Sequence, residues 1–204
     1  ILRHNERSAS SHSNPDIDAN QTHFNYYLSP PHLRSDYDFF KEKLTNYRCM
    51  NRKDIVKLAS WLITAPVDLS PEQEPLFFSL CHDFLNARYG SENEIQAVVH
   101  YDEVHTYKDK ITGLMKTSRP HLHYCFIPSI IDKNEQQHIC AKKVINRADL
   151  RNFHLDLQNY LVENGVHASV YSGITQRNGG NITVNNLKKE IPSAERKHER
   201  SFIF

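Results

Sequence analysis

The stretch RPHLHYCFIPSII, residues 119–131, is the most informative part of the chain. Its residues are mostly apolar, bulky and partly β-branched, a pattern that predicts a buried strand. His121 and His123 lie two residues apart within it, and side chains two apart on a strand point to the same face. Leu122 and Tyr124 then point to the other face. The stretch therefore predicts a buried strand that carries two imidazoles side by side.

A third histidine lies late in the segment EIQAVVHYD, residues 94–102, which also has the pattern of a strand. The intervening residues 105–118 are polar with one central Gly, which predicts an excursion or a hairpin and hence antiparallel pairing of the two flanking strands. His100 would then lie near His121 and His123. Three neutral imidazoles on one face make an open-sided site for a divalent ion, and they suit Mn, Zn, Ni or Co better than Mg.

Two acids follow the third histidine. Asp102 shares the face of His100 on a regular strand, whereas Glu103 reaches that face only if the strand ends or bulges there. A single His on a strand is usually a hydrogen-bonded core or rim residue, and strand-end acids are ordinary. The three histidines together with adjacent acids favour a metal site.

The remaining segments predict an α+β fold, in which a central, mainly antiparallel β-sheet is flanked by helices. Ser70 and Gln73 have the spacing of a capping box at the start of a helix that ends before Gly90. In the last predicted helix Leu150, Phe153, Leu157, Tyr160 and Leu161 form one apolar side. The predicted elements are an irregular start over 1–33 with a short strand near 22–31, helices over 34–47, 70–89 and 147–164, and a strand over 54–65.

The composition is that of an ordinary globular domain. The chain has 204 residues, 39% hydrophobic and 24% charged, with a net charge of +1 and no apolar run long enough to span a membrane. Four scattered cysteines without a C-x-x-C pair indicate free thiols, so we expect a reducing cytoplasm. The bulk charge does not indicate a nucleic-acid partner, although a local basic patch would be compatible with it. The 13 histidines are the unusual count.

Two blocks of the sequence resemble a known family. HYDE, residues 100–103, followed by RPHLH, residues 119–123, is similar to the H-x-D-E-x-T-P-H-x-H signature of the MobV-type plasmid mobilisation relaxases. These are also called plasmid recombination enzymes and belong to the His-hydrophobe-His (HUH) endonucleases. HNERSASSHSNPDIDANQTHFNYYL, residues 4–28, resembles their amino-terminal motif. The chain departs from the family by an insertion over 104–119 and by the few residues before HNER, where a first strand is usual.

The resemblance implies an activity and a partner. A relaxase nicks and rejoins one DNA strand at a transfer origin, keeps the 5′ phosphate covalently on the protein, and so initiates conjugative mobilisation. We expect one relaxase domain over residues 1–204, with a charged, helical tail over about 188–204. We also expect it to be the amino-terminal fragment of a longer protein whose dimer contacts lie in a region beyond this chain. The expected partner is transfer-origin DNA, a single strand with adjacent duplex or hairpin, and no membrane segment is expected here.

The resemblance also implies roles for individual residues. His4 is the expected nucleophile, oriented by Glu103, and a neutral imidazole is competent for this near pH 7. Tyr26 is the rival, because many HUH enzymes use Tyr. The expected metal is Mn²⁺, with Mg²⁺, Zn²⁺, Ni²⁺ or Co²⁺ as alternatives. The metal ligands are His100, His121 and His123, and the expected DNA-contacting residues are Arg7, Asn14, Asp16 and, one residue before Pro120, Arg119.

Three other functions fit parts of the sequence. A rolling-circle replication initiator of the HUH class would use the same three histidines and a Tyr on a later helix, where Tyr160 lies, although Tyr160 also fits the apolar side of that helix. A non-catalytic origin-binding repressor would bind the DNA without metal. A small-molecule metal hydrolase would have no use for the HNER block.

Overall fold

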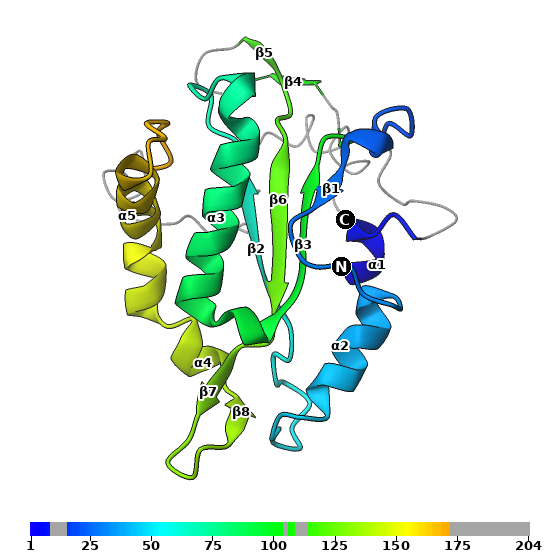
Figure 1. The fold of residues 1–204 in the computed structure, drawn as a ribbon, viewed down its shortest axis with the longest axis vertical. Coiled ribbons are helices and arrows are strands. Elements are labelled where there is room, and N and C mark those ends of the chain that lie inside the picture. Colours follow the sequence, from blue (N-terminus) through cyan, green and yellow to red (C-terminus); the bar gives the residue numbers. More distant parts are fainter. Residues whose placement is uncertain (9–15, 104–105, 109–113, 172–204) are drawn as a thin grey trace, which may run out of the picture. The chain divides into compact units, whose positions relative to one another are not determined.

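Figure 1 shows the computed structural model, which describes residues 1–8, 16–103, 106–108 and 114–171. Four strands form its central sheet in the order β1-β3-β6-β2, and all neighbours are antiparallel. Their bounds are β1 Tyr26–Tyr27, β2 Ala59–Thr64, β3 Glu94–His100 and β6 His121–Phe126. The predicted α+β class with an antiparallel sheet is therefore confirmed, as is the pairing of β3 with β6.

The two faces of the sheet bury different residues. Leu122 and Tyr124 point into the larger core cluster, which also contains Phe77 of α3 and Phe153 of α5. In Figure 1, α3 (Glu74–Tyr89) crosses one face of the sheet and α5 (Arg147–Glu163) lies beside it. Cys125 faces the other side and joins a smaller cluster. The alternation predicted for this segment thus separates two faces of the sheet. One is the face covered by α3 and α5, called here the helix-covered face, and the other bears the histidines.

The smaller elements complete the fold. Near the smaller cluster lie the short helix α1 (Leu2–Asn5) and α2 (Asp36–Leu44). The hairpin expected over 105–118 is present in its described parts, where β4 pairs antiparallel with β5. The other elements are 3₁₀ turns at Thr22–Phe24, Pro71–Gln73 and Ser91–Asn93, strands β4 Thr106–Lys108, β5 Met115–Thr117, β7 Ser129–Ile131 and β8 Gln137–Ile139, and helix α4 Ala141–Val144.

One strand prediction was wrong at its end. The apolar run to residue 131 is not one strand, because β6 ends at Phe126 and the chain then begins β7, which pairs with β8 in a separate two-stranded sheet. Pro128 lies at this change, and proline has no N–H to donate to a sheet ladder. A continuous apolar pattern therefore covers two strands in two sheets.

Helix ends and faces also differ from prediction. The Ser70 side chain makes no cap hydrogen bond, because Pro71–Gln73 form a 3₁₀ turn and α3 begins only at Glu74. Gly90, with φ of 87°, ends that helix as expected. Leu150 is 50% exposed and lies outside the core that Phe153, Leu157 and Leu161 enter.

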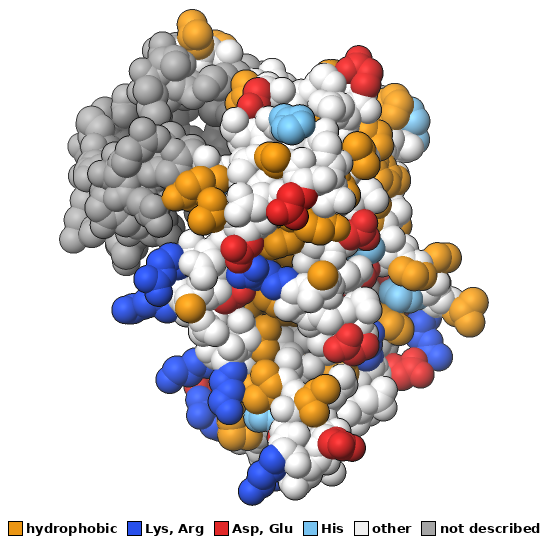
Figure 2. Space-filling view, turned by 60° about the vertical axis from the view of Figure 1, so that its left-hand side comes forward, with side chains coloured by type: hydrophobic (Ala, Val, Ile, Leu, Met, Phe, Trp, Pro, Cys, Tyr) orange, Lys and Arg blue, Asp and Glu red, His pale blue; other side chains and the backbone are white. Residues whose placement is uncertain are grey.

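The amino-terminal segment was expected to be irregular, yet Leu2–Asn5 form a helix. The predicted tail over 188–204 lies outside the described residues. Among the described residues, no helix has the length and apolarity needed to cross a membrane. Figure 2 shows Lys and Arg side chains gathered at the lower left of one face, so positive charge is locally concentrated although the net charge is only +1.

Candidate metal centre and nucleophile

Three histidines and one glutamate meet at the end of the central sheet. His100, the last residue of β3, pairs in register with His121, the first residue of β6. The Nε2 atoms of His121 and His123 are 3.1 Å apart. One ligand atom from each of these histidines and one from Glu103 all lie within 4.8 Å of one another. Sequence spacing thus correctly predicted that the three imidazoles lie together.

Glu103 reaches the cluster because β3 ends before it. The strand stops at His100, and Glu103 forms an isolated bridge with Ile17. Its Oε2 atom lies 3.9 Å from His121 Nε2. The donor set of three imidazoles and one carboxylate suits a divalent transition metal such as Mn²⁺ or Zn²⁺, so the residues present fit such an ion. The glutamate was expected only to orient His4, and its place among these donors adds a fourth potential ligand.

The protonation states of the cluster suit metal binding. Burial lowers the pKa of His123 to about 3, helped by His100 and His121 nearby. Burial also lowers the pKa of His121. For Glu103, burial would raise the pKa, but the hydrogen bond from Arg7 and the positive charge of its guanidinium outweigh this effect and hold the pKa well below its usual value. Near neutral pH, His121 and His123 are therefore uncharged and the carboxyl is ionised, the states in which these groups bind metals.

A backbone carbonyl holds His100 in place. Its Nε2 atom lies 2.9 Å from the carbonyl oxygen of Asn5, and both residues are buried. Because a carbonyl only accepts, this nitrogen carries a proton. The other nitrogen, Nδ1, lies 3.1 Å from Arg7 Nη2, which only donates, so Nδ1 presents its lone pair. Nδ1 lies 3.5 Å from Glu103 Oε1, on the side of the cluster. The motifs did not assign Asn5 a role, because the contact comes from its backbone and only the fold reveals it.

The short helix α1 brings His4 to the same place. Its Nε2 atom lies 3.1 Å from Glu103 Oε1, although 99 positions separate the two residues in the chain. The His4 side chain keeps 35% of its surface exposed. Burial lowers the pKa of His4 against the opposing effect of Glu103, so the ring is neutral near pH 7. The structure thus contains a partly exposed, neutral imidazole held by a carboxylate beside the metal-ligand set.

Arg7 lies inside this arrangement. It has a left-handed φ of 55°, and its buried guanidinium donates to both oxygens of Asp102 at 2.8 and 2.6 Å and to Glu103 Oε1 at 2.8 Å. Thr22 Oγ1 also donates to Asp102, at 3.0 Å. Burial would raise the pKa of Asp102, but the hydrogen bonds from Arg7 and other neighbours lower it to about 2. Arg7 therefore holds the two carboxylates in position. Its predicted contact with DNA remains a prediction.

Tyr26 lies on the other face of the sheet. It pairs with Val99 on β3, and the two side chains belong to the helix-covered core. Burial, with Glu74 nearby, raises the pKa of Tyr26 to about 12. The structure therefore does not bring this hydroxyl to the histidine cluster.

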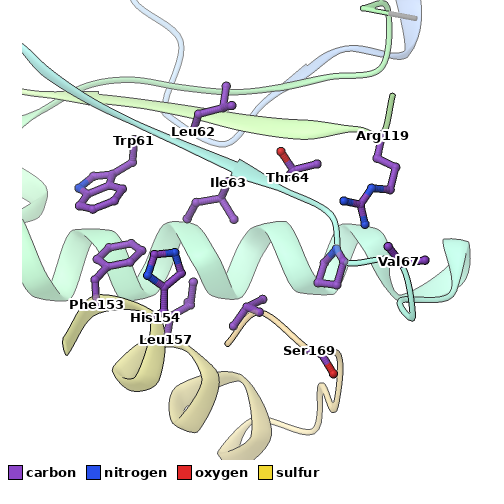
Figure 3. A pocket seen from close by; sticks show the side chains of 12 residues that line it. Trp61, Leu62, Ile63, Thr64, Val67, Arg119, Phe153, His154, Leu157 and Ser169 are labelled. Carbon is purple, nitrogen blue, oxygen red and sulfur yellow. The ribbon is translucent and has the colours of Figure 1, made fainter. Parts of the chain in front are cut away.

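The other predicted DNA-contacting residues are scattered. Asn14 lies outside the described residues, and Asp16 directly precedes Ile17, which bridges Glu103. Arg119 reaches one end of a cavity of about 290 Å³ between the edge of β2 and α5 (Figure 3), whose other end is formed by the stacked rings of Trp61 and Phe153. The Arg119 side chain thus lines this cavity, and its predicted DNA contact remains a prediction.

Known proteins are similar to this chain in sequence. The family model described as Mob_Pre, plasmid recombination enzyme, matches residues 1–189. A plasmid recombination enzyme of Lactiplantibacillus plantarum is 31% identical over 196 residues, which is 92% of this chain and 48% of that protein. One of Streptococcus agalactiae is 28% identical over 207 residues, 97% of this chain and 37% of that protein. The chain therefore spans about half of these relatives or less.

A solved structure agrees. The Mn-bound crystal structure of the MobM relaxase domain (MOBV; Mob_Pre) with plasmid pMV158 oriT DNA at pH 6.8 has a TM-score of 0.66 and 26% sequence identity. The match covers 94% of this chain and 91% of that one. The same domain at pH 5.5 has a TM-score of 0.65. By sequence and by fold, this chain belongs to the Mob_Pre family of plasmid recombination enzymes.

Proposed function

We propose that this chain nicks and rejoins one DNA strand at the transfer origin of a plasmid or mobile element, through a covalent 5′-phosphate intermediate. The observation that carries this proposal is the contact between His4 and Glu103 beside His100, His121 and His123. It combines a neutral nucleophile, an acid that orients it, and a ligand set for a divalent ion. Binding of oriT DNA by the related MobM domain supports DNA as the substrate.

The metal site would take Mn²⁺, the ion bound in the MobM structures. His100, His121 and His123 would hold it, with Glu103 as a fourth ligand. When bound, such an ion supplies Lewis-acid chemistry that polarises the phosphate and neutralises charge on its oxygens. The partly exposed edge of the cluster is where the phosphate would enter.

The residues of this chain supply the nucleophile. With Nε2 of His4 donating to Glu103, the lone pair lies on Nδ1, which attacks the phosphorus. The new N–P bond forms as the bond from phosphorus to the 3′ oxygen breaks, and the leaving oxygen takes a proton from water. Glu103 offsets the positive charge that develops on the ring. Attack by the 3′ hydroxyl reverses the sequence and rejoins the strand.

The test is a nicking assay on a supercoiled plasmid that carries the cognate origin, with Mn²⁺ present. We expect His4→Ala to lower the nicking rate at least about 10³-fold, whereas Tyr26→Phe nicks like the wild type because its hydroxyl lies on the other face of the sheet. A covalent protein–DNA adduct on denaturing gels should depend on His4.

The outcomes separate the alternatives. Loss of nicking in Tyr26→Phe with activity in His4→Ala would keep the enzyme class and move the nucleophile. Activity in both, with loss in Tyr160→Phe, would favour the mechanism of a replication initiator. Binding of the origin by a wild type that never cuts would favour a repressor.

A further inference from the structure

A buried chain of polar side chains lies beneath α1. Asn5 Nδ2 donates to Oε1 of Gln96 on β3 at 2.8 Å. Gln96 Nε2 donates in turn to Oδ2 of Asp36, the first residue of α2. Asn5, Gln96 and Asp36 are all buried, with 1%, 0% and 6% of their surfaces exposed. Because breaking a buried hydrogen bond leaves polar groups unpaired, these bonds tie α1, β3 and α2 together.

We call the hydrogen-bonded side chains of Asn5, Gln96 and Asp36 the relay. Its hydrogen bonds run in one direction. A carboxylate only accepts, so Asp36 takes an N–H from the Gln96 amide. That leaves the Gln96 oxygen as the acceptor for Asn5. The amide of Asn5 therefore has one orientation, although neither amide carries a charge.

α1 depends on such contacts for its position. A helix of four residues is not stable alone, because its few internal hydrogen bonds do not offset the cost of nucleation. Leu2 and Asn5 are the residues it buries. Leu2 enters the smaller core cluster, and its carbonyl oxygen lies 3.3 Å from Gln96 Nε2. Gln96 therefore contacts both ends of this helix.

Two features of the proposed site follow from where α1 lies. The carbonyl of Asn5 accepts from His100 Nε2, and Arg7, which follows α1, donates to His100 Nδ1 at 3.1 Å, so both contacts keep the ring proton on Nε2. His4, the residue before Asn5, is held 3.1 Å from Glu103 only if α1 stays in place. A shift of this one turn would disturb both.

We infer that Asn5 and Gln96 are positioning residues, which seat α1 on the sheet and thereby set the tautomer of His100 and the place of the His4 ring. This inference rests on the proposed function, because it concerns the same site. Neither side chain touches the reacting atoms, so the effect reaches the site through α1.

Three variants separate positioning from general stability. Gln96→Met keeps the length of the side chain and removes both hydrogen bonds of the relay. Asp36→Asn keeps an oxygen that accepts from Gln96 and should preserve it. Ile139→Val removes a methyl group from the smaller core cluster, which Leu2 of α1 also enters, and leaves every hydrogen bond of the relay in place.

The measurements are the tautomer of His100 in the metal-free full chain, by ¹⁵N NMR of histidine side chains, and Mn²⁺ affinity by titration. Wild type, Asp36→Asn and Ile139→Val should show one tautomer with the proton on Nε2 and similar affinities. Gln96→Met should show mixed tautomers and bind Mn²⁺ about tenfold more weakly or worse, the size expected when a partner behind a metal ligand is lost.

The inference is overturned if Gln96→Met keeps the wild-type tautomer and affinity, or if Ile139→Val changes them as much. If Gln96→Met does not fold, Asn5→Leu removes the relay from the other side, and unfolding of both would show a purely structural role. Nicking is assayed separately. A wild type that never nicks refutes the proposed function, while the NMR comparison still decides the role of the relay.

Discussion

Glu103 contacts both the proposed nucleophile and the proposed metal ligands. Its Oε1 atom lies 3.1 Å from His4 Nε2 and 2.8 Å from Arg7 Nη2, and its Oε2 atom faces His121. One carboxylate therefore touches the proposed nucleophile, a fixed cation and the proposed metal ligands. Each of these neighbours lies close to the negative charge of the carboxylate.

Glu103→Gln tests that charge with little change of shape. We expect the nicking rate to fall about 10²-fold or more, because the amide neither offsets charge on His4 nor binds a divalent ion as a carboxylate does. Single-turnover cleavage of an origin oligonucleotide measures the rate, and titration measures Mn²⁺ affinity. Glu163→Gln, at the exposed end of α5, is the matched control and should change neither. Wild-type cleavage by Glu103→Gln would refute the assigned role.

Asp102 tests the buried ion pair with Arg7. Asp102→Asn keeps the volume but leaves the guanidinium with less negative charge around it, since Glu103 is its remaining acid partner. Removing one partner of a buried ion pair usually costs at least about 3 kcal/mol. The free energy of unfolding should therefore fall by roughly that amount. Urea denaturation measures it. A change below about 0.5 kcal/mol would mean that the pair adds no net stability.

At the scale of elements, α5 shows how a helix covers the sheet. The ring of Phe153 stacks on Trp61 of β2, with centroids 3.8 Å apart, and meets Phe84 of α3 edge-on at 5.6 Å. Leu150, one turn earlier on the same helix, is half exposed. The apolar side of α5 is therefore narrower than its sequence suggests.

Phe153→Ala and Leu150→Ala form a matched pair on this helix. Removing the buried ring should cost about 3–5 kcal/mol, because transfer and cavity terms add. Leu150→Ala should change stability by less than about 1 kcal/mol, because half of its surface already meets water. Thermal and urea denaturation of both variants provide the comparison. Equal losses would place Leu150 in the core after all.

At the scale of the molecule, the proposed metal site joins elements that are distant in the sequence. His100 ends β3, His121 and His123 begin β6, and Glu103 lies in the segment after β3. Unfolding separates these ligands. A bound ion therefore stabilises the folded chain by mass action.

Mn²⁺ at about 100 times its dissociation constant should add about 2.7 kcal/mol, which raises Tm by roughly 5 °C or more for a chain of this length. EDTA should reverse the rise, and His121→Ala should abolish it. Differential scanning fluorimetry with and without Mn²⁺ measures the shift. An equal rise in His121→Ala would place the ion elsewhere.

The sequence alone determined the parts of this protein that depend on local pattern. Alternation along 119–126 assigned His121 and His123 to one face and Leu122 and Tyr124 to the other, and antiparallel pairing brought His100 to them. The family motifs pointed to His4 and Glu103, whose side chains are in contact. Periodicity suffices here because a strand repeats every two residues whatever surrounds it.

Only the tertiary structure decided the rest. The register of β1 with β3 places Tyr26 against the core beneath α3, the packing of a four-residue helix brings His4 to the other face, and the Asn5 carbonyl accepts from His100 Nε2. Each of these depends on contacts between residues about 70 to 100 positions apart. Local preferences cannot specify such contacts, because they form only when distant segments bury their surfaces together.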